Sequence, residues 1–265
     1  MVSKKIKKHN NASTFKSWDS YSVFSLATRH GNRYIHNEEV MYFLDAVLST
    51  GKAKERVIKK DSNFWRAQIG NDWRSIFNDG AEIGEEACPY PPSRMKPLPC
   101  LATEGRANPK GIPHLYLATN KETAMSEVRP WLGTNISVGQ FKVKEALRLI
   151  DCSVHHGKGL VLYLDEPDVE KRELSVWTHI DNAFSKPVNS SDKTSDYVPT
   201  QIIAELFKSE GYDGIIYKSS LATGFNVVLF DMNIADLINC FLYEAEFIEL
   251  KFKENSNPYF VRKLQ

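Results

Sequence analysis

Apolar residues recur at helical spacing in an early stretch of the chain. Residues 40, 43, 44, 47 and 48 are all apolar, and they fall on one stripe of a helix. Asn37 can cap the N-terminus of this helix, and Gly51 is a natural stop. We therefore expect a helix from Asn37 to Gly51. A second, charged helix is expected through residues 52–60.

Further along, proline and capping signals divide the chain. Five of the twelve prolines lie in CPYPPSRMKPLP, so residues 78–99 should be irregular and extended on the surface. Residues 114–118 (HLYLA) predict a strand. Thr119 and Glu122 have the spacing of a capping box, and Pro130 should end the following helix at about Arg129. Further strands are expected at residues 136–143, 147–151 and 160–164.

The C-terminal third begins with a polar stretch, residues 182–196, that is typical of a loop. A helix should follow from Tyr197 to Gly211, with Ile202, Ile203, Leu206 and Phe207 on its buried face. Strands are expected at residues 214–217, 226–230 and 241–252. The pattern predicts an α+β fold with mixed short strands. We divide it into a helical N-terminal extension, residues 1–60, and a main domain, residues 61–265.

Composition narrows the function classes. The charges balance, with 34 Lys+Arg against 33 Asp+Glu, which argues against a dedicated nucleic-acid binder. The chain contains no apolar run long enough to span a membrane and no secretory signal. The cysteines, Cys88, Cys100, Cys152 and Cys240, are scattered without metal-ligand spacing. We expect reduced thiols, no metal and a cytoplasmic location.

Residues 104–133 hold the clearest candidate site. Arg106, Tyr116 and Glu127 follow one another at intervals of ten and eleven residues, on a predicted turn, strand and helix. An arginine fork suits a phosphate or carboxylate, although a structural ion pair is the alternative. The tyrosine can form a wall for a flat ring or simply pack in the core. The glutamate can stabilise positive charge at an anomeric carbon, or it can be a solvated helix residue.

Other polar residues could join this site. Ser219 and Ser220 open a loop between two predicted strands, where they could hydrogen-bond a ligand. Arg66, in FWRAQ, could contact an anion or pack at the edge of the core. Gln201 and Glu205 could border the site, although a solvated helix face is the favoured interpretation.

Four segments together resemble the RES-domain family. They are FWRAQ around Arg66, GRANPKGIPHLYLA around Arg106 and Tyr116, ETAMSEVRPW around Glu127, and YDGIIYKSS–GFNVVLF around Ser219. The resemblance covers about residues 60–232. It implies a bacterial toxin that consumes NAD and a core similar to that of ADP-ribosyltransferases. The family's aromatic residue after Gly-Arg is replaced here by Ala107.

The resemblance also implies residue roles. Arg106, Glu127 and Ser219 would act in catalysis. Arg66, Tyr116, Asn108 and Ser220 would contact NAD, which is the substrate. The expected reaction is cleavage of the nicotinamide N-glycosidic bond, by a glycohydrolase or phosphorylase. An ADP-ribosyltransferase that modifies a protein or nucleic acid remains an alternative, as does a non-catalytic nucleotide-binding module. A separate antitoxin is an expected partner, and the oligomeric state is not readable.

Overall fold

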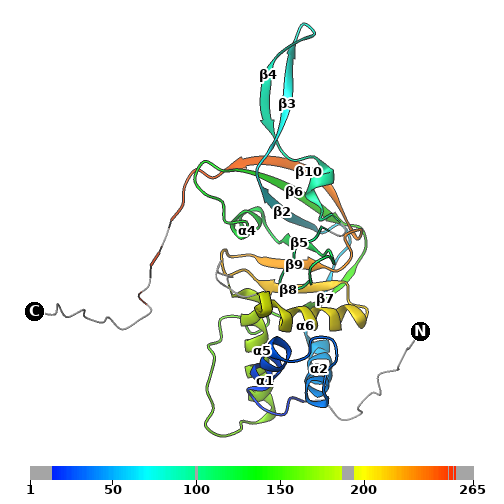
Figure 1. Cartoon of the computed structure of the whole chain (residues 1–265), viewed down its shortest axis with the longest axis vertical. Helices are drawn as coiled ribbons and strands as arrows, with labels where there is room; N and C mark the ends of the chain where they lie inside the picture. Colours follow the sequence, from blue (N-terminus) through cyan, green and yellow to red (C-terminus); the bar gives the residue numbers. More distant parts are fainter. Residues whose placement is uncertain (1–13, 99–100, 187–193, 250, 253, 255–265) are drawn as a thin grey trace, which may run out of the picture.

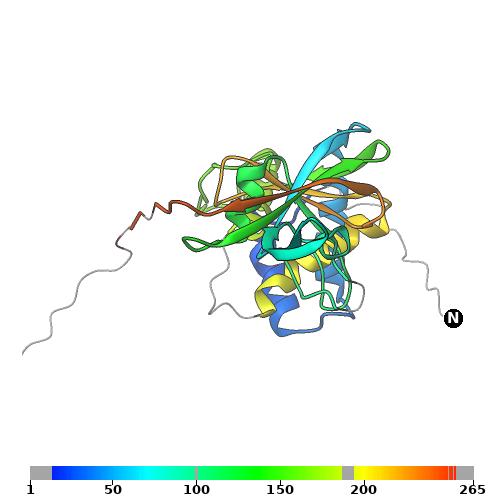
Figure 2. The same ribbon diagram turned by 90° about the horizontal axis from the view of Figure 1, so that it is seen from above.

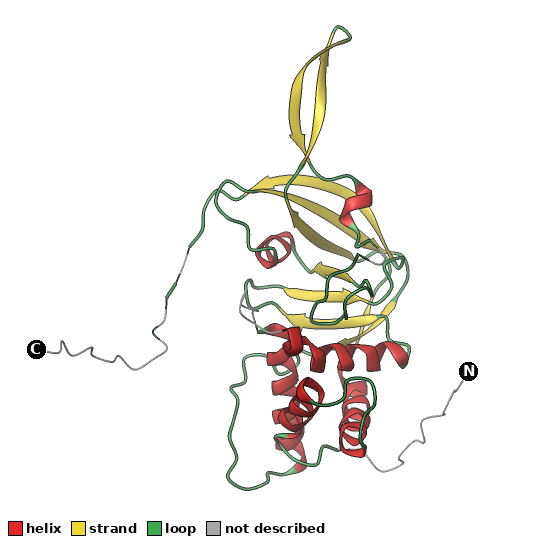
Figure 3. Cartoon of the chain, viewed as in Figure 1, coloured by secondary structure: helices red, strands yellow, loops and turns green. Residues whose placement is uncertain are grey.

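The four longest helices gather at one end of the molecule, and the strands, with two short helices beside them, form the other (Figure 1 and Figure 3). The computed structural model describes residues 14–98, 101–186, 194–249, 251–252 and 254. The helices are α1 (Ser20–His30), α2 (Glu38–Gly51), α3 (Pro92–Met95), α4 (Lys121–Glu127), α5 (Val169–Ser185) and α6 (Val198–Ser209). Two 3-10 helices, η1 (Lys52–Lys54) and η2 (Thr194–Tyr197), complete the helical elements of the described residues.

The strands form one large mixed sheet and a separate hairpin. They are β1 (Glu55–Ile58), β2 (Asn63–Ile69), β3 (Asp72–Asn78), β4 (Ala81–Cys88), β5 (Leu115–Ala118), β6 (Asn135–Val143), β7 (Leu147–Asp151), β8 (Gly214–Lys218), β9 (Phe225–Leu229) and β10 (Ala235–Glu244). The large sheet has the order β1-β7-β8-β9-β5-β2-β6-β10, and β3 pairs with β4. Within the large sheet β7 and β8 run parallel, whereas the other pairs are antiparallel. The expected α+β class with a mixed sheet is confirmed.

Few residue pairs hold the middle of the large sheet together. Strands β2 and β5 share a single residue pair, Trp65 with Ala118. By contrast, β2 and β6 are paired over seven positions, from Asn63 to Ile69. The strands therefore diverge on either side of the β2–β5 contact, and the sheet opens into two halves. Figure 2 shows the strands from above, with the helices beneath them.

The helical end forms one apolar core. Phe24 of α1 stacks on Phe43 of α2, with ring centroids 4.3 Å apart. Trp177 of α5 is fully buried, and its indole nitrogen donates to Thr50 of α2 at 2.9 Å. These side chains belong to the same buried cluster as residues of α6 and of strands β8 and β9. The N-terminal helices thus pack into the core instead of standing apart from it.

Local signals account for most of the elements that the sequence predicts. Asn37 caps α2 by accepting a hydrogen bond from the Val40 backbone at 2.9 Å. Pro199 lies in the first turn of α6, and Gly211 follows that helix with a φ of +82°. The strands expected at residues 114–118, 136–143, 147–151, 214–217 and 226–230 are also confirmed.

The charged helix expected at residues 52–60 is absent from the structure. These residues form η1 and strand β1 instead of a second helix, and β1 pairs with β7 at the edge of the sheet. Residues 55–58 form a strand and not a helix because β7, which lies far along the chain, pairs with them through backbone hydrogen bonds. Residues 55–58 of the predicted extension therefore belong to the main sheet. The division at residue 60 itself stays a prediction.

Residues 78–99 are also more regular than expected. The hairpin of β3 and β4 projects from the sheet, and after Cys88 the chain is irregular apart from the short helix α3 (Figure 1). The helix after β5 is capped by Asn120, not Thr119, and it ends at Glu127. The last strand begins at Ala235 and ends at Glu244, earlier than the expected 241–252, because it follows the length of β6.

Two further expectations were wrong in the middle of the chain. Residues 160–164 form no strand, since they have no neighbouring strand among the described residues. Part of the expected loop at 182–196 is helical, because α5 continues to Ser185 and η2 begins at Thr194. Residues 187–193 of that loop lie outside the described residues, as does Cys100. None of the helices described is long and apolar enough to cross a membrane.

Phe24→Ala tests whether the N-terminal helices and the rest of the core unfold together. Phe24 is only 2% exposed, so its truncation should lower the free energy of unfolding by about 3–5 kcal/mol. Leu26→Ala on the same helix is the control, because Leu26 is 65% exposed and should cost less than about 0.5 kcal/mol. Urea unfolding followed by tryptophan fluorescence measures both. An unchanged main transition in Phe24→Ala would contradict the shared core.

His114 gives the fold a defined pH dependence. Burial, with the nearby Lys208 charge, lowers the pKa of His114 from 6.5 to about 4. Between these pH values the unfolded chain binds a proton that the native state does not. Stability should therefore rise from about pH 4 to 6.5, by at most about 1.4 kcal/mol per pH unit from this residue, and then level off.

Urea midpoints measured against pH check this expectation. His114→Gln should flatten the profile relative to the unmodified protein, whereas substitution of the exposed His30 by Gln should leave the slope in place. Identical slopes in His114→Gln and the unmodified protein would contradict the assignment.

Candidate active site

A cleft lies where the two halves of the sheet diverge. Three adjoining cavities of about 340, 270 and 260 Å³ form it. The first and second share Arg66 and Tyr116 in their walls, and the second and third share Glu127, Tyr217 and Asn226. A separate hollow of about 190 Å³ between α1 and α2 is mostly apolar and contains none of the predicted site residues.

Glu127 is held in place where the second and third cavities meet. It is the last residue of α4, and its Oε1 accepts a hydrogen bond from Ser219 Oγ at 2.6 Å. The same oxygen accepts a second bond from Asn226 Nδ2 at 2.7 Å. Two donors from the β8–β9 hairpin therefore fix a carboxylate that belongs to a different element. This makes Glu127 an oriented group and not a freely rotating surface side chain.

Ser219 is itself fixed by a tight turn. It is buried directly after β8, and its Oγ accepts hydrogen bonds from the backbone of Leu221 and Ala222. The turn packs closely on α4, since a Cβ added at Gly224 would lie 2.3 Å from Thr123 Oγ1. Only glycine permits this approach. Because its hydroxyl donates a hydrogen bond to Glu127, Ser219 acts as a support for the carboxylate.

Arg106 lies on the wall of the third cavity, together with Arg129 and Ser220. Its Nη1 donates to the carbonyl oxygen of Ala183 at 2.8 Å, near the C-terminus of α5. Its guanidinium also lies 5.9 Å from the centre of the Tyr197 ring. Ser220 donates to the Ser185 carbonyl at 2.7 Å. The end of α5 thus positions both side chains that the sequence predicts for this wall.

The loop that carries Arg106 is locked by buried polar groups. Tyr116 donates to Asn108 Oδ1 at 2.7 Å and accepts from the Ala107 backbone at 3.0 Å. Asn108 Nδ2 in turn bonds the carbonyls of Thr103, Pro109 and Ile112. Gln201 Nε2 donates to the carbonyls of Gly105 and Asn108. These bonds give the arginine a rigid base.

Asn108 and Tyr116, two of the residues predicted to contact the ligand, therefore hold the loop in place. The buried Asn108 amide is engaged by the loop, and the hydroxyl of Tyr116 is engaged with it. Burial raises the pKa of the Tyr116 hydroxyl, which keeps it a neutral donor. Tyr116 nevertheless lines the first and second cavities. Gln201 is buried as well, so the solvated-face interpretation was wrong for this residue, whereas Glu205 is exposed.

Arg66 spans the two halves of the sheet. It lies on β2, and its Nη1 donates to the Tyr116 carbonyl on β5 at 3.2 Å. Its Nε is buried without a hydrogen-bond partner among the described residues. Burial lowers the pKa of Arg66 to about 10, so it still bears its charge at neutral pH. This leaves a buried positive charge lining the first two cavities.

The structure brings most predicted residues to one cleft. Arg66, Arg106, Tyr116, Asn108, Glu127 and Ser220 all line it, and Ser219 contacts it through Glu127. Sequence reasoning missed Asn226 and Tyr217. An asparagine in the apolar strand FNVVL was the available signal for the first. Tyr217 stacks on Phe184 and lines two of the cavities, and burial raises the pKa of its hydroxyl.

This arrangement suits a ligand with both anionic and cationic or polarised parts. Arginine and tyrosine side chains line both of the cavities that meet at the fixed Glu127 carboxylate. Guanidinium groups bind phosphate oxygens well, and a carboxylate can stabilise positive charge that develops on a sugar. Among the described residues, no group of three or more His, Cys, Asp or Glu side chains is placed to hold a metal ion.

Comparisons with known proteins bear on the family. A search of curated proteins found no match. The crystal structure of the M. tuberculosis MbcT–MbcA toxin–antitoxin complex aligns with 12% identity and a TM-score of 0.36, covering 75% of this chain and 92% of that chain. That likeness is too distant to inform the fold or activity of this chain.

The family comparison is direct. The RES domain model matches residues 81–246, more than half of the chain. The match includes Arg106, Tyr116, Glu127 and Ser219, and it leaves Arg66 outside. The expected resemblance is thereby confirmed: the chain belongs to the RES-domain family.

Proposed function

We propose that this protein cleaves the bond between nicotinamide and ribose in NAD. The observation that supports the proposal most is the carboxylate of Glu127, fixed by Ser219 and Asn226 between cavities that contain arginines. Membership of the RES-domain family adds to it, because the resemblance implies NAD as the substrate. The specific reaction is a glycohydrolase or phosphorylase activity.

Each residue has a role in this reaction. Arg106 binds the pyrophosphate, and Ser220 hydrogen-bonds the ligand beside it. The rings of Tyr116 and Tyr217 flank the nicotinamide. When the C1′–N bond breaks, the nicotinamide leaves as a neutral molecule with the bonding electrons. Glu127 stabilises the positive charge that develops on the ribose, and an oxygen of water or phosphate then forms the new bond to C1′, with water losing a proton to solvent.

Ser219 is a positioning residue in the proposal, as is Asn226. Both donate to the same oxygen of Glu127, which sets the direction of the carboxylate. Arg66 supplies a second cationic contact for the ligand, on the far side of Tyr116. Asn108, which is hydrogen-bonded to Tyr116, holds the loop that carries Arg106. The proposed role in the cell is that of a cytoplasmic toxin that depletes NAD and is neutralised by a separate antitoxin.

Glu127→Gln tests the central residue. The amide keeps the size of the side chain but removes the negative charge, so kcat for nicotinamide release should fall by about 100-fold or more. Arg106→Lys should also lower the rate, because lysine lacks the planar fork. The matched control is Glu122→Gln on the same helix, which lines none of the three cavities and should leave the rate unchanged. Equal rates in both glutamine variants would refute the role of Glu127.

A phosphate titration identifies the acceptor of the ADP-ribosyl group. Purified protein is incubated with NAD, with and without inorganic phosphate, and the products are separated by chromatography. Release of nicotinamide that requires phosphate indicates a phosphorylase, and release without phosphate indicates a glycohydrolase. We expect release in at least one condition. Intact NAD in both conditions, from folded protein free of inhibitor, would exclude both activities.

A further inference from the structure

The segment from Lys158 to Asp165 exposes an unusual run of apolar side chains. It joins β7 to α5 and has the sequence KGLVLYLD. Leu162 is 85% exposed and Leu164 is 104% exposed, and Leu160 and Val161 are also exposed. In Figure 1 the segment is the yellow-green loop that stands away from the helices beside α5. Soluble monomers rarely present a contiguous apolar surface of this kind to water.

The backbone of the segment also lacks a pairing strand among the described residues. In the part of the chain that the structure describes, residues 159–165 make no backbone hydrogen bond. Its composition of Leu, Val and Tyr is nonetheless that of a strand, which is why the sequence predicts one there. The segment thus has the side chains and free backbone groups of a strand but lacks a neighbouring strand.

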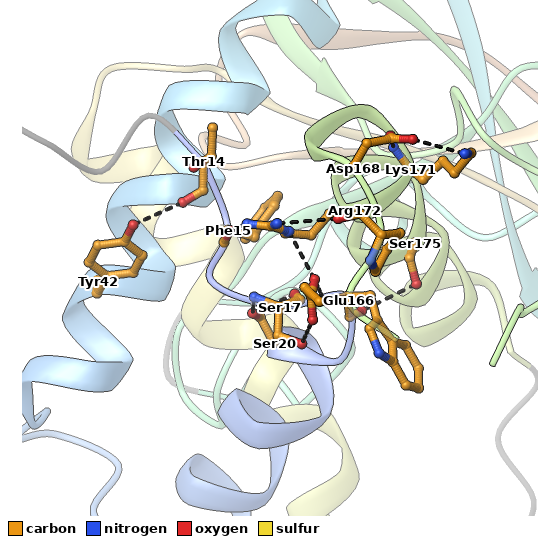
Figure 4. Close-up of polar contacts among 12 residues, drawn as sticks. Thr14, Phe15, Ser17, Ser20, Tyr42, Glu166, Asp168, Lys171, Arg172 and Ser175 are labelled. Atoms are coloured by element: carbon orange, nitrogen blue, oxygen red, sulfur yellow. Dashed lines mark hydrogen bonds and ion pairs between the residues drawn. The ribbon is translucent and has the colours of Figure 1, made fainter. Parts of the chain in front are cut away.

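The two ends of the segment are fixed to the helical core. Glu166 accepts from Ser17 Oγ at 2.6 Å and from the Trp18 backbone at 3.1 Å, and it pairs with Arg172 Nε at 2.9 Å (Figure 4). Before the segment, His156 Nδ1 lies 2.8 Å from Asp181 of α5. Within the segment, the Tyr163 ring lies 5.9 Å from that of Trp18, whereas Leu160, Val161, Leu162 and Leu164 stay exposed to solvent.

The charges at the two ends of the segment favour pairing with a second copy of the same segment. The basic residue Lys158 precedes the apolar run, and the acidic residues Asp165, Glu166 and Asp168 follow it. An identical segment running antiparallel places the basic end of one copy beside the acidic end of the other. A parallel arrangement would bring like charges together, which is unfavourable. The segment is therefore complementary to itself.

We propose that two copies of this chain dimerise by antiparallel pairing of residues 158–166. A twofold axis at Leu162 gives the best register, because it places Leu160 opposite the partner's Leu164 and Leu162 opposite the partner's Leu162. Lys158 then lies at the acidic end of the partner's segment. The pairing supplies the missing backbone hydrogen bonds and covers the exposed leucines. The cleft remains open, because its arginine and serine contact the far end of α5, about 25 Å away along that helix.

Substitutions at Leu162 test the register, because this residue faces its own copy. Leu162→Asp and Leu162→Lys should each weaken dimerisation by about 100-fold or more, since each places like charges opposite one another. A mixture of the two variants should restore a one-to-one heterodimer, visible by native mass spectrometry. Ile83→Asp, on the exposed β3–β4 hairpin at the opposite end of the molecule, is the control and should remain dimeric.

A cysteine scan gives a second readout. Leu162→Cys should form an intermolecular disulfide under mild oxidation, because directly opposed cross-strand residues have suitable separation. Leu160→Cys should cross-link with Leu164→Cys but not with itself, and the unmodified protein controls for its native cysteines. A monomeric protein across a wide concentration range would overturn the proposal, as would a dimer that persists in Leu162→Asp. Nicotinamide release should be unchanged in the Leu162 variants, so this test is independent of the proposed activity.

Discussion

The single residue pair between β2 and β5 is the constraint on which the cleft depends. Trp65 and Ala118 keep the halves of the sheet together, and the lack of further pairing lets the strands diverge. Arg66 reinforces the join by donating to the Tyr116 carbonyl across the gap. An opened sheet normally leaves backbone groups unsatisfied. Here a side chain supplies one of the missing bonds and brings a positive charge into the opening.

The polar groups around the cleft are mostly engaged in holding one another. Tyr116, Asn108 and Gln201 fix the loop of Arg106, and Ser219 and Asn226 fix the carboxylate of Glu127. Such pre-organisation matters because a group that is already oriented needs no rearrangement during a reaction. The rigid base explains how a loop, an element that is commonly mobile, can carry a residue at a candidate active site.

The helical end supports the same cleft from beneath. Carbonyl oxygens near the C-terminus of α5 accept hydrogen bonds from Arg106 and Ser220. The buried face of the same helix packs on α2 through Trp177. The N-terminal helices are thus connected to the site through α5. At the other end of α5, Glu166 and Arg172 tie the connecting segment to the start of α1 (Figure 4).

Local pattern by itself determined the capped helix after Asn37 and the strands around Tyr116 and Ser219. It indicated an arginine, a tyrosine and a glutamate as site candidates but left a structural alternative open for each. These signals lie within a few residues of one another, so they are readable without a fold. The tertiary structure alone decided that β1 joins the sheet, that Gln201 is buried, and that Asn226 holds Glu127 from 99 positions away. Each of these depends on a partner distant in the chain. Whether a polar residue is solvated or engaged is set by that partner, which local spacing does not specify.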